Sequence, residues 1–131
     1  MRLSDNARTA MINALVDLTD GGSGAGTVQI RDGTAPAGPS EAATGTLLVT
    51  LTFNDPAFGA GAAGVADVDV DPSVSAFAVA SGTPTWYRVL DSDSTAIWDG
   101  DVSADMTVEP ASIVNGGVVT LTSWSVTQPA S

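Results

Sequence analysis

The sequence predicts a mainly β protein: a single antiparallel β-sandwich, jelly-roll-like, of about seven strands with one N-terminal helix. Three observations support this fold class. Apolar and polar residues alternate along most of the chain after residue 26. The 14 glycines and 7 prolines separate the alternating runs at short intervals, which is typical of sandwiches and barrels. The length of 131 residues suits one domain with a modest core.

The N-terminal segment, residues 3–19, carries a helical period instead. Its apolar stripe comprises Leu3, Ala7, Met11, Ala14, Leu15 and Leu18, and Ile12 and Val16 lie beside it. Ser4 is expected to cap the helix, and the glycines after Asp20 to end it. A helix of this length is marginal alone in water and must pack on its own sheet or on a neighbour. We therefore divide the chain into residues 1–22, a helix with a glycine stop that would serve as a docking arm, and 23–131, the β-sandwich domain.

The strands follow in order, each marked by alternation or by β-branched residues. They are expected at residues 27–31, 46–54, 65–70, 85–91, 96–102, 106–110 and 117–127. Two loops rich in small residues, 32–45 and 55–64, separate the first three strands. The run GGSGAG (21–26) follows a helix and lacks GK[ST], so we interpret it as a flexible joint and not as a phosphate-binding loop.

The composition argues against several classes of function. The chain has no Cys, no His and no Lys, and its formal net charge is −11. Disulfides, thiolate metal sites and the usual general base are therefore absent. A surface this acidic would repel nucleic acid and anionic membranes. No Ser stands in a G-x-S-x-G context. We expect no enzymatic activity, no cofactor and no metal site.

The segment after residue 90 resembles the start of a calcium loop. Asp91, Asp93 and Thr95 occupy the first three ligand positions of an EF-hand. The sixth position is Ala96 where the turn requires glycine, and the twelfth is Val102 where a bidentate carboxylate is required. The sequence therefore argues against an EF-hand.

A second acidic run, DVDVD, would place Asp67, Asp69 and Asp71 on one face of a strand. Carboxylates at that spacing could bind a divalent cation weakly. Alternation by itself produces the same pattern, with Val68 and Val70 facing inward. We favour a solvated strand face over a metal site.

The run SDST (92–95) has the length of a common hairpin loop between two strand-like segments. The implied register has three pairs: Asp91 with Ala96, Val89 with Trp98 and Arg88 with Asp99. An arginine opposite an aspartate is a favourable cross-strand pair and can be bidentate. We predict a structural ion pair between Arg88 and Asp99.

The order of five motifs resembles a known protein family. The motifs are LSDNARTAMINAL, VQIRDGTAPA, ATGTLLVTLTFNDPAFG, GTPTWYRVLDSDSTAIWDGDV and a strand of the form I-x-x-G-x-V-V-T-L-T-S. Over nearly the whole chain they are similar to small virion structural proteins of tailed bacteriophages and prophages of Gram-negative bacteria. Family members often carry glycine at the hairpin tip, where this chain has Ser94. The resemblance implies a structural role on the virion.

Within that class, the expected function is a capsid decoration (cement) protein that stabilises the head lattice. The protein would be made in the host cytoplasm without a signal peptide and would reside on the virion. Its partners would be the major capsid protein or other virion proteins, as a homo-oligomer or bound to the lattice. The helix stripe residues expected to contact the partner are Leu3, Met11, Leu15 and Leu18.

Two alternatives stay open. The protein could be a neck, tail-tip or fibre-anchoring component of the virion. It could also be a carbohydrate-binding β-sandwich module, in which Trp86, Trp98 and Trp124 would stack on sugar rings. Core packing is the favoured interpretation of these tryptophans, and the exposure of their side chains distinguishes the two.

Overall fold

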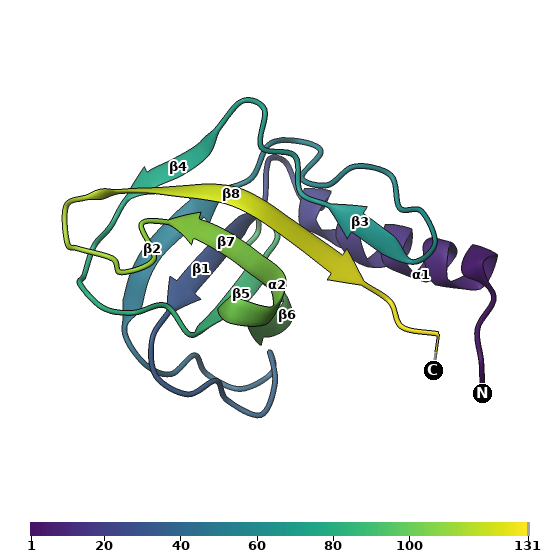
Figure 1. Ribbon diagram of the computed structural model, residues 1–131, viewed down its shortest axis with the longest axis horizontal. Helices are drawn as coiled ribbons and strands as arrows, with labels where there is room; N and C mark the ends of the chain where they lie inside the picture. The colour runs from purple at the N-terminus through teal and green to yellow at the C-terminus, as the bar shows by residue number, and fades with distance from the viewer. Residues whose placement is uncertain (131) are drawn as a thin grey trace.

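The computed structural model describes residues 1–130 and confirms the predicted fold class. Eight strands form two antiparallel sheets, and one long helix lies at an end of the molecule beside both chain termini (Figure 1). The strand added to the expected set is β4 (Val74–Phe77), in a segment for which we predict none. Its four residues include one serine and one alanine, which are weak strand signals.

The first sheet has the strand order β2-β1-β5-β6. Its members are β1 (Thr27–Arg31), β2 (Leu47–Thr52), β5 (Trp86–Leu90) and β6 (Ala96–Asp101). In β1, Val28 and Ile30 are buried, whereas Gln29 and Arg31 lie on the opposite face. The loop 32–45 folds back over that outer face, because its main-chain carbonyls accept hydrogen bonds from β5 side chains. Both faces of β5 are consequently buried.

The second sheet is built on one long strand. Its members are β3 (Val65–Asp67), β4, β7 (Met106–Glu109) and β8 (Val118–Thr127). β3 and β4 pair in succession along one side of β8, and β7 pairs along the other (Figure 1). The predicted strand 65–70 is therefore too long: pairing with β8 ends soon after Asp67, and the chain makes a turn before β4 begins.

The two sheets enclose one core. On one side Val79 N donates to Leu48 O at 2.8 Å, which joins β2 to the segment after β4. On the other side the short helix α2 (Val102–Asp105) connects β6 to β7. Five aromatic rings pack in contact inside the sandwich: Phe53, Phe58, Tyr87, Trp98 and Trp124. Such tilted and edge-on contacts add about 0.5–1.5 kcal/mol each beyond burial.

The helix α1 (Asp5–Asp17) begins where predicted, because Ser4 Oγ accepts the N–H of Ala7 at 3.1 Å. Its buried residues are Ile12 and Val16, and not the predicted stripe. The helix therefore packs on its own domain through the two residues that lie beside the stripe. Ile12 lies against Gly61, where a Cβ would come within 2.6 Å of the Ile12 side chain. The missing side chain at Gly61 lets this face approach the loop closely.

The helix is an integral part of the domain. Ile12 and Val16 belong to the same hydrophobic core as the strands. The short 3₁₀ helix η1 (Leu18–Asp20) follows α1, and Asp20 Oδ1 accepts the N–H of Ala57 at 2.9 Å. Residues 1–22 thus pack as part of the sandwich and do not form the separate arm that we expected.

The glycine run 21–26 is held in place, which corrects its interpretation as a flexible joint. Ser92 Oγ in the β5–β6 loop donates to Gly21 O at 2.9 Å and accepts from Gly24 N at 3.2 Å. Gly26 is buried, and a Cβ there would lie 2.6 Å from Leu90 O. The glycines serve close backbone packing against the hairpin.

Candidate functional site

The predicted ion pair is present in the hairpin of β5 and β6. Arg88 and Asp99 are register partners. Arg88 Nε donates to Asp99 Oδ1 at 2.7 Å, and Nη2 donates to Oδ2 at 3.0 Å. Both side chains are largely buried. The hydrogen bond from Asp99 raises the pKa of Arg88, although burial opposes this effect. The pair is therefore bidentate and charged.

Arg88 also anchors the loop above it. Its Nη2 donates to Gly38 O at 3.2 Å, and its guanidinium carbon lies 5.6 Å from the centroid of the Trp86 ring. Trp86 Nε1 in turn donates to Asp32 O at 3.1 Å. One buried cation thus holds together β5, β6 and the loop 32–45, which assigns a structural role to this cluster.

The hairpin register agrees with the prediction at two of three pairs. Val89 faces Trp98, as Arg88 faces Asp99. At the end of the ladder Leu90 faces Ala96, and the predicted pair between Asp91 and Ala96 is wrong. A bulge between Val89 and Leu90 shifts the register by one residue.

The bulge leaves Asp91 to organise the hairpin tip. Its Oδ1 accepts the N–H groups of Asp93 at 2.9 Å and Thr95 at 3.0 Å. Ser94 adopts a left-handed conformation with φ of 65°, the position at which glycine is favoured. The Asp91 carboxylate therefore stabilises the turn.

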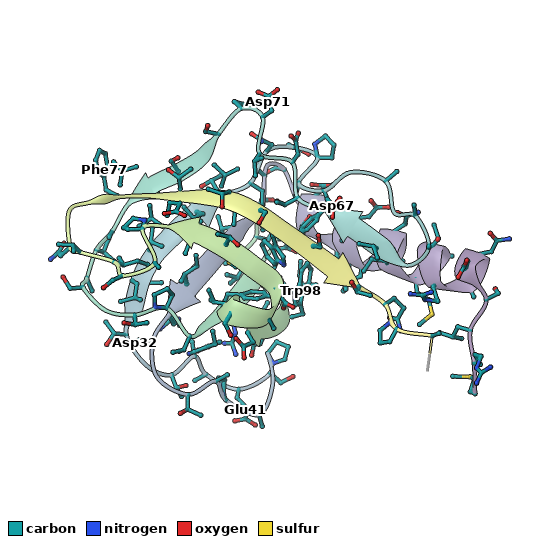
Figure 2. The ribbon with its side chains drawn as sticks, viewed as in Figure 1. Asp32, Glu41, Asp67, Asp71, Phe77 and Trp98 are labelled. Carbon is teal, nitrogen blue, oxygen red and sulfur yellow. The ribbon has the colours of Figure 1, made fainter. Side chains whose placement is uncertain are left out.

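The second acidic run does not form a continuous strand face. Asp67 ends β3, and its Oδ1 accepts the Ser125 hydroxyl at 2.6 Å. Asp69 Oδ1 accepts the N–H of Asp71 at 3.0 Å. Figure 2 shows Asp71 at the outermost point of the turn, away from Asp67. Across residues 1–130 no three acidic side chains lie close enough together to hold a metal ion.

An open groove of about 490 Å³ lies between the loop segment 33–39 and the hairpin. Two carboxylates, Asp99 and Asp101, stand in its wall. Asp99 is bound by Arg88, and Asp101 Oδ1 accepts both the N–H and the hydroxyl of Ser103 at 2.9 Å. Each carboxylate therefore already accepts hydrogen bonds from within the domain.

Arg31 lies on the outer face of the sheet, where its register partner is Trp86. Its Nη2 donates to Gln29 Oε1 at 3.1 Å, whereas its Nε is buried without a hydrogen-bond partner among the described residues. Burial lowers the pKa of Arg31, and the nearby charge of Arg88 adds to the effect. Arg31 is the least satisfied polar side chain of the outer face.

Trp98 and Trp124 pack in the core, and Trp86 is covered by the loop 32–45. Trp86 and Trp124 are buried, and Trp98 is partly buried. Trp98 Nε1 donates to the Tyr87 hydroxyl at 3.2 Å, and that hydroxyl donates to Asp105 Oδ2 at 2.6 Å. Two of the three rings therefore lack the accessible face that stacking on a sugar requires, as core packing predicts.

The single tyrosine is enclosed on every side. Burial, followed by the bond to Asp105, raises the pKa of Tyr87. Its ring lies directly over Gly100, its register partner on β6, and a Cβ at position 100 would clash with the ring. The hydroxyl is therefore held in its protonated form as a packing element.

Large apolar side chains are exposed in two places. On α1 and η1, Met11 and Leu18 are 45% and 55% exposed, whereas the other two predicted contact residues, Leu3 and Leu15, are partly covered. We call Met11 and Leu18 the helix surface. These are two of the four residues that the sequence predicts as contacts with a partner.

The second exposed group was missed by the sequence reasoning. It comprises Phe77 (71% exposed), Val79 (61%), Val114 (63%) and Val118 (53%), which we call the tip surface. Phe77 projects from the end of β4 away from the ribbon (Figure 2). The available signal was SVSAFAVA, in which apolar residues occupy both alternating positions, so that one set must face outward.

Comparison of the chain with protein-family models, curated proteins and solved structures found no match. Within residues 1–130 no helix is both long enough and apolar enough to span a membrane.

Proposed function

We propose that this protein is a non-enzymatic virion structural protein of a tailed phage, and within that class a capsid decoration protein that stabilises the head lattice. The main support is that a protein with a closed core exposes large apolar side chains at two separate places. The N-terminal end of α1 and the Phe77 side chain lie toward opposite ends of the long axis (Figures 1 and 2). Exposed apolar groups of this kind are typical of docking surfaces.

Two buried polar clusters of the domain support the proposal, because their charged and hydroxyl groups are bonded to one another. Arg88 and Asp99 neutralise each other, and Tyr87 bonds to Asp105. A catalytic acid or base would need a reactive group exposed to a substrate. The groove beside the hairpin instead has carboxylates that are already hydrogen-bonded within the protein.

The charge is consistent with a position on the outside of a head. With a net charge of −11 and no Lys, the protein would be repelled by packaged DNA. Basic residues on a partner would instead steer it toward its site, more strongly at low salt.

The helix surface is the proposed contact with the head. Met11 and Leu18 are about half exposed, so that covering them would contribute about 1.5–3 kcal/mol together, before ordering is counted. That contribution is modest for one contact. A lattice of equivalent sites needs only a modest affinity per copy to be extensively occupied when the protein is abundant.

The test is binding to purified particles. The full chain would be added to heads that lack it, and bound copies counted by quantitative mass spectrometry. We expect many copies per head, with binding reduced in Met11→Asp and in Leu18→Asp. Ala10→Asp, on the other exposed flank of the same helix, adds the same charge and is expected to bind normally.

The outcome separates the candidates. A few copies confined to the neck or tail tip would refute decoration in favour of the tail alternative. Normal binding by Met11→Asp and Leu18→Asp would refute the helix surface as the contact. Deletion of residues 1–20 is a poorer test, because it removes Ile12 and Val16 from the core.

A further inference from the structure

The tip surface is a defined piece of structure and not a frayed end. Ala78, between Phe77 and Val79, donates its N–H to Gly117 O at 2.8 Å and accepts from Gly116 N at 2.9 Å. Gly117 N donates to Val114 O at 2.9 Å. The segment after β4 and the loop before β8 are thus bonded to each other, and their four apolar side chains are presented on an ordered backbone.

The pairing of the strands brings the exposed side chains together. Phe77 and Val118 are register partners of β4 and β8. Val79 continues the same alternation beyond Phe77, and its N–H is taken by Leu48 O. The backbone edge at this point is therefore occupied within the molecule, so a partner would contact side chains and would not add a strand.

The tip surface lies in the uncharged part of the protein. Residues 72–87 and 110–130 contain no Asp, Glu, Lys or Arg, and together they supply β4, β8 and the loops around the tip. The net charge of −11 is therefore carried by other segments. Next to the apolar pair the outer face continues with Ser75 and Thr120, whose hydroxyls bond to each other at 2.9 Å. Beyond them lies Glu109 of β7, the register partner of Thr120.

This charge distribution favours one occupant over others. Two identical copies with a charge of −11 each repel one another wherever acidic surfaces meet. Apposition of two neutral tips avoids that repulsion at the contact. A partner with basic groups would gain more from the acidic remainder of the surface than from this end. The neutral apolar tip therefore fits a second copy of this chain better than a basic partner.

We propose that the tip surface, formed by Phe77, Val79, Val114 and Val118, is a self-association site that a second copy of this chain covers in a two-fold symmetric pair. A two-fold pair places the same surface on both copies, so that each Phe77 gains an apolar partner without a second complementary surface. This inference does not rest on the virion assignment, because it concerns the isolated protein.

The size of the surface predicts weak association. The largest apolar patch on a typical monomer is about 300–600 Å², and a standard stable interface needs about 800 Å² per partner. The apolar centre must therefore be completed by polar neighbours such as the Ser75 and Thr120 hydroxyls. Weak pairing of this kind would become strong only where copies are held close together.

The experiment is sedimentation equilibrium of the full chain. The concentration would run from about 10 µM to about 1 mM, the range in which a small interface dimerises. We expect the mean mass to rise from 13.1 kDa toward twice that value. Added NaCl should strengthen pairing, because it screens repulsion between two acidic copies. A contact held by attraction between opposite charges would instead weaken when NaCl is added.

Substitutions identify the surface. Phe77→Asp should weaken pairing by about 10- to 100-fold, since it removes an apolar side chain and adds two like charges per pair. Val118→Asp is a second variant in case the first does not fold. Leu18→Asp, an equally charged change on the helix surface, should pair like the wild type.

Three results would overturn the proposal. One is a wild-type chain that stays at 13.1 kDa throughout the series at low and high salt. Another is pairing of a folded Phe77→Asp or Val118→Asp protein with unchanged affinity. The third is loss of pairing in Leu18→Asp, which would indicate a head-to-tail contact. None of these results would bear on binding to heads, so the two proposals can fail separately.

Discussion

Replacing Arg88 by alanine tests the central structural claim about the hairpin. The substitution removes the cation that bonds both oxygens of Asp99 and the carbonyl of Gly38. It leaves the Asp99 carboxylate enclosed with no counter-charge. The loop 32–45 loses one of its attachments to the sheet, and Trp86 loses the guanidinium over its ring.

The expected loss follows from the burial of the pair. Removing one member of a buried ion pair costs about 3–5 kcal/mol. Asp99 is on the outer face, under a single loop, and can regain some water when the loop loosens. We therefore expect about 3 kcal/mol, at the lower end of that range. At about 2.1 cal/mol/K of unfolding entropy per residue, this corresponds to a fall in Tm of about 10 °C.

The assay is urea and thermal unfolding followed by tryptophan fluorescence, for Arg88→Ala, Asp99→Ala and the double variant. The double variant should lose less than the sum of the two single losses, with a coupling of about 2 kcal/mol, because the second substitution relieves the orphaned charge. Asp5→Ala is the matched control. It breaks an exposed ion pair with Arg8 and should change stability by less than about 1 kcal/mol.

Two results would refute this reasoning. A Tm of Arg88→Ala within about 2 °C of the wild type would show that the pair contributes little to folding. Additive effects in the double variant would show that the residues act independently. A further check is Arg88→Met with Asp99→Leu, which should recover most of the stability, since apolar replacement of a buried pair is often neutral.

Two further predictions concern the same hairpin. Ser94→Gly should raise the free energy of unfolding by about 0.5–1 kcal/mol, because glycine tolerates the left-handed φ of 65° at the tip; a Ser94→Gly protein no more stable than the wild type in urea would contradict this. Tyr87 has a pKa raised by burial and by Asp105, above the value of about 10 in an unfolded chain. In the native state Tyr87 therefore stays protonated at a pH where it would ionise in the unfolded chain. The contribution of Tyr87 to the free energy of unfolding is full below pH about 10 and is lost as the pH rises further. Tyrosinate absorbance should consequently appear together with unfolding, and its appearance near pH 10 in a chain that is still folded by circular dichroism would refute the prediction.

Much of the local structure was predictable because the signals are local. The start of α1 follows from a side chain three residues before the N–H it caps, in Ser4 and Ala7. The alternation in β1 reports which residues face a core. The pair of Arg88 with Asp99 follows from counting outward from a short loop. The ladder ends one residue off the predicted register, at Leu90 and Ala96, and the adjacent bulge restores that register at the pair.

The errors have a common origin. Ile12 is buried where Gly61 lets the helix approach closely. That loop is remote in sequence, so the periodicity of the helix residues carries no information about it. The composition of the run 21–26 predicts a flexible joint, but Gly21 and Gly24 are hydrogen-bonded to Ser92, which is remote in sequence. The alternation of residues 65–70 predicts one strand, whereas β3 ends at Asp67 and the next segment that pairs with β8 is β4.

By itself, the sequence determined the fold class, the helix cap, the partners in the buried ion pair and the acidic, Lys-free character of the surface. These depend on period, turn length and composition, which are properties of short segments or of the whole chain. Only the tertiary structure decided which helix face is buried and which apolar side chains remain exposed. Phe77 and Val118 became neighbours on an uncharged end because β4 pairs with β8. Burial is a relation between distant segments, so the exposure of the tip surface is determined by how the sheets assemble.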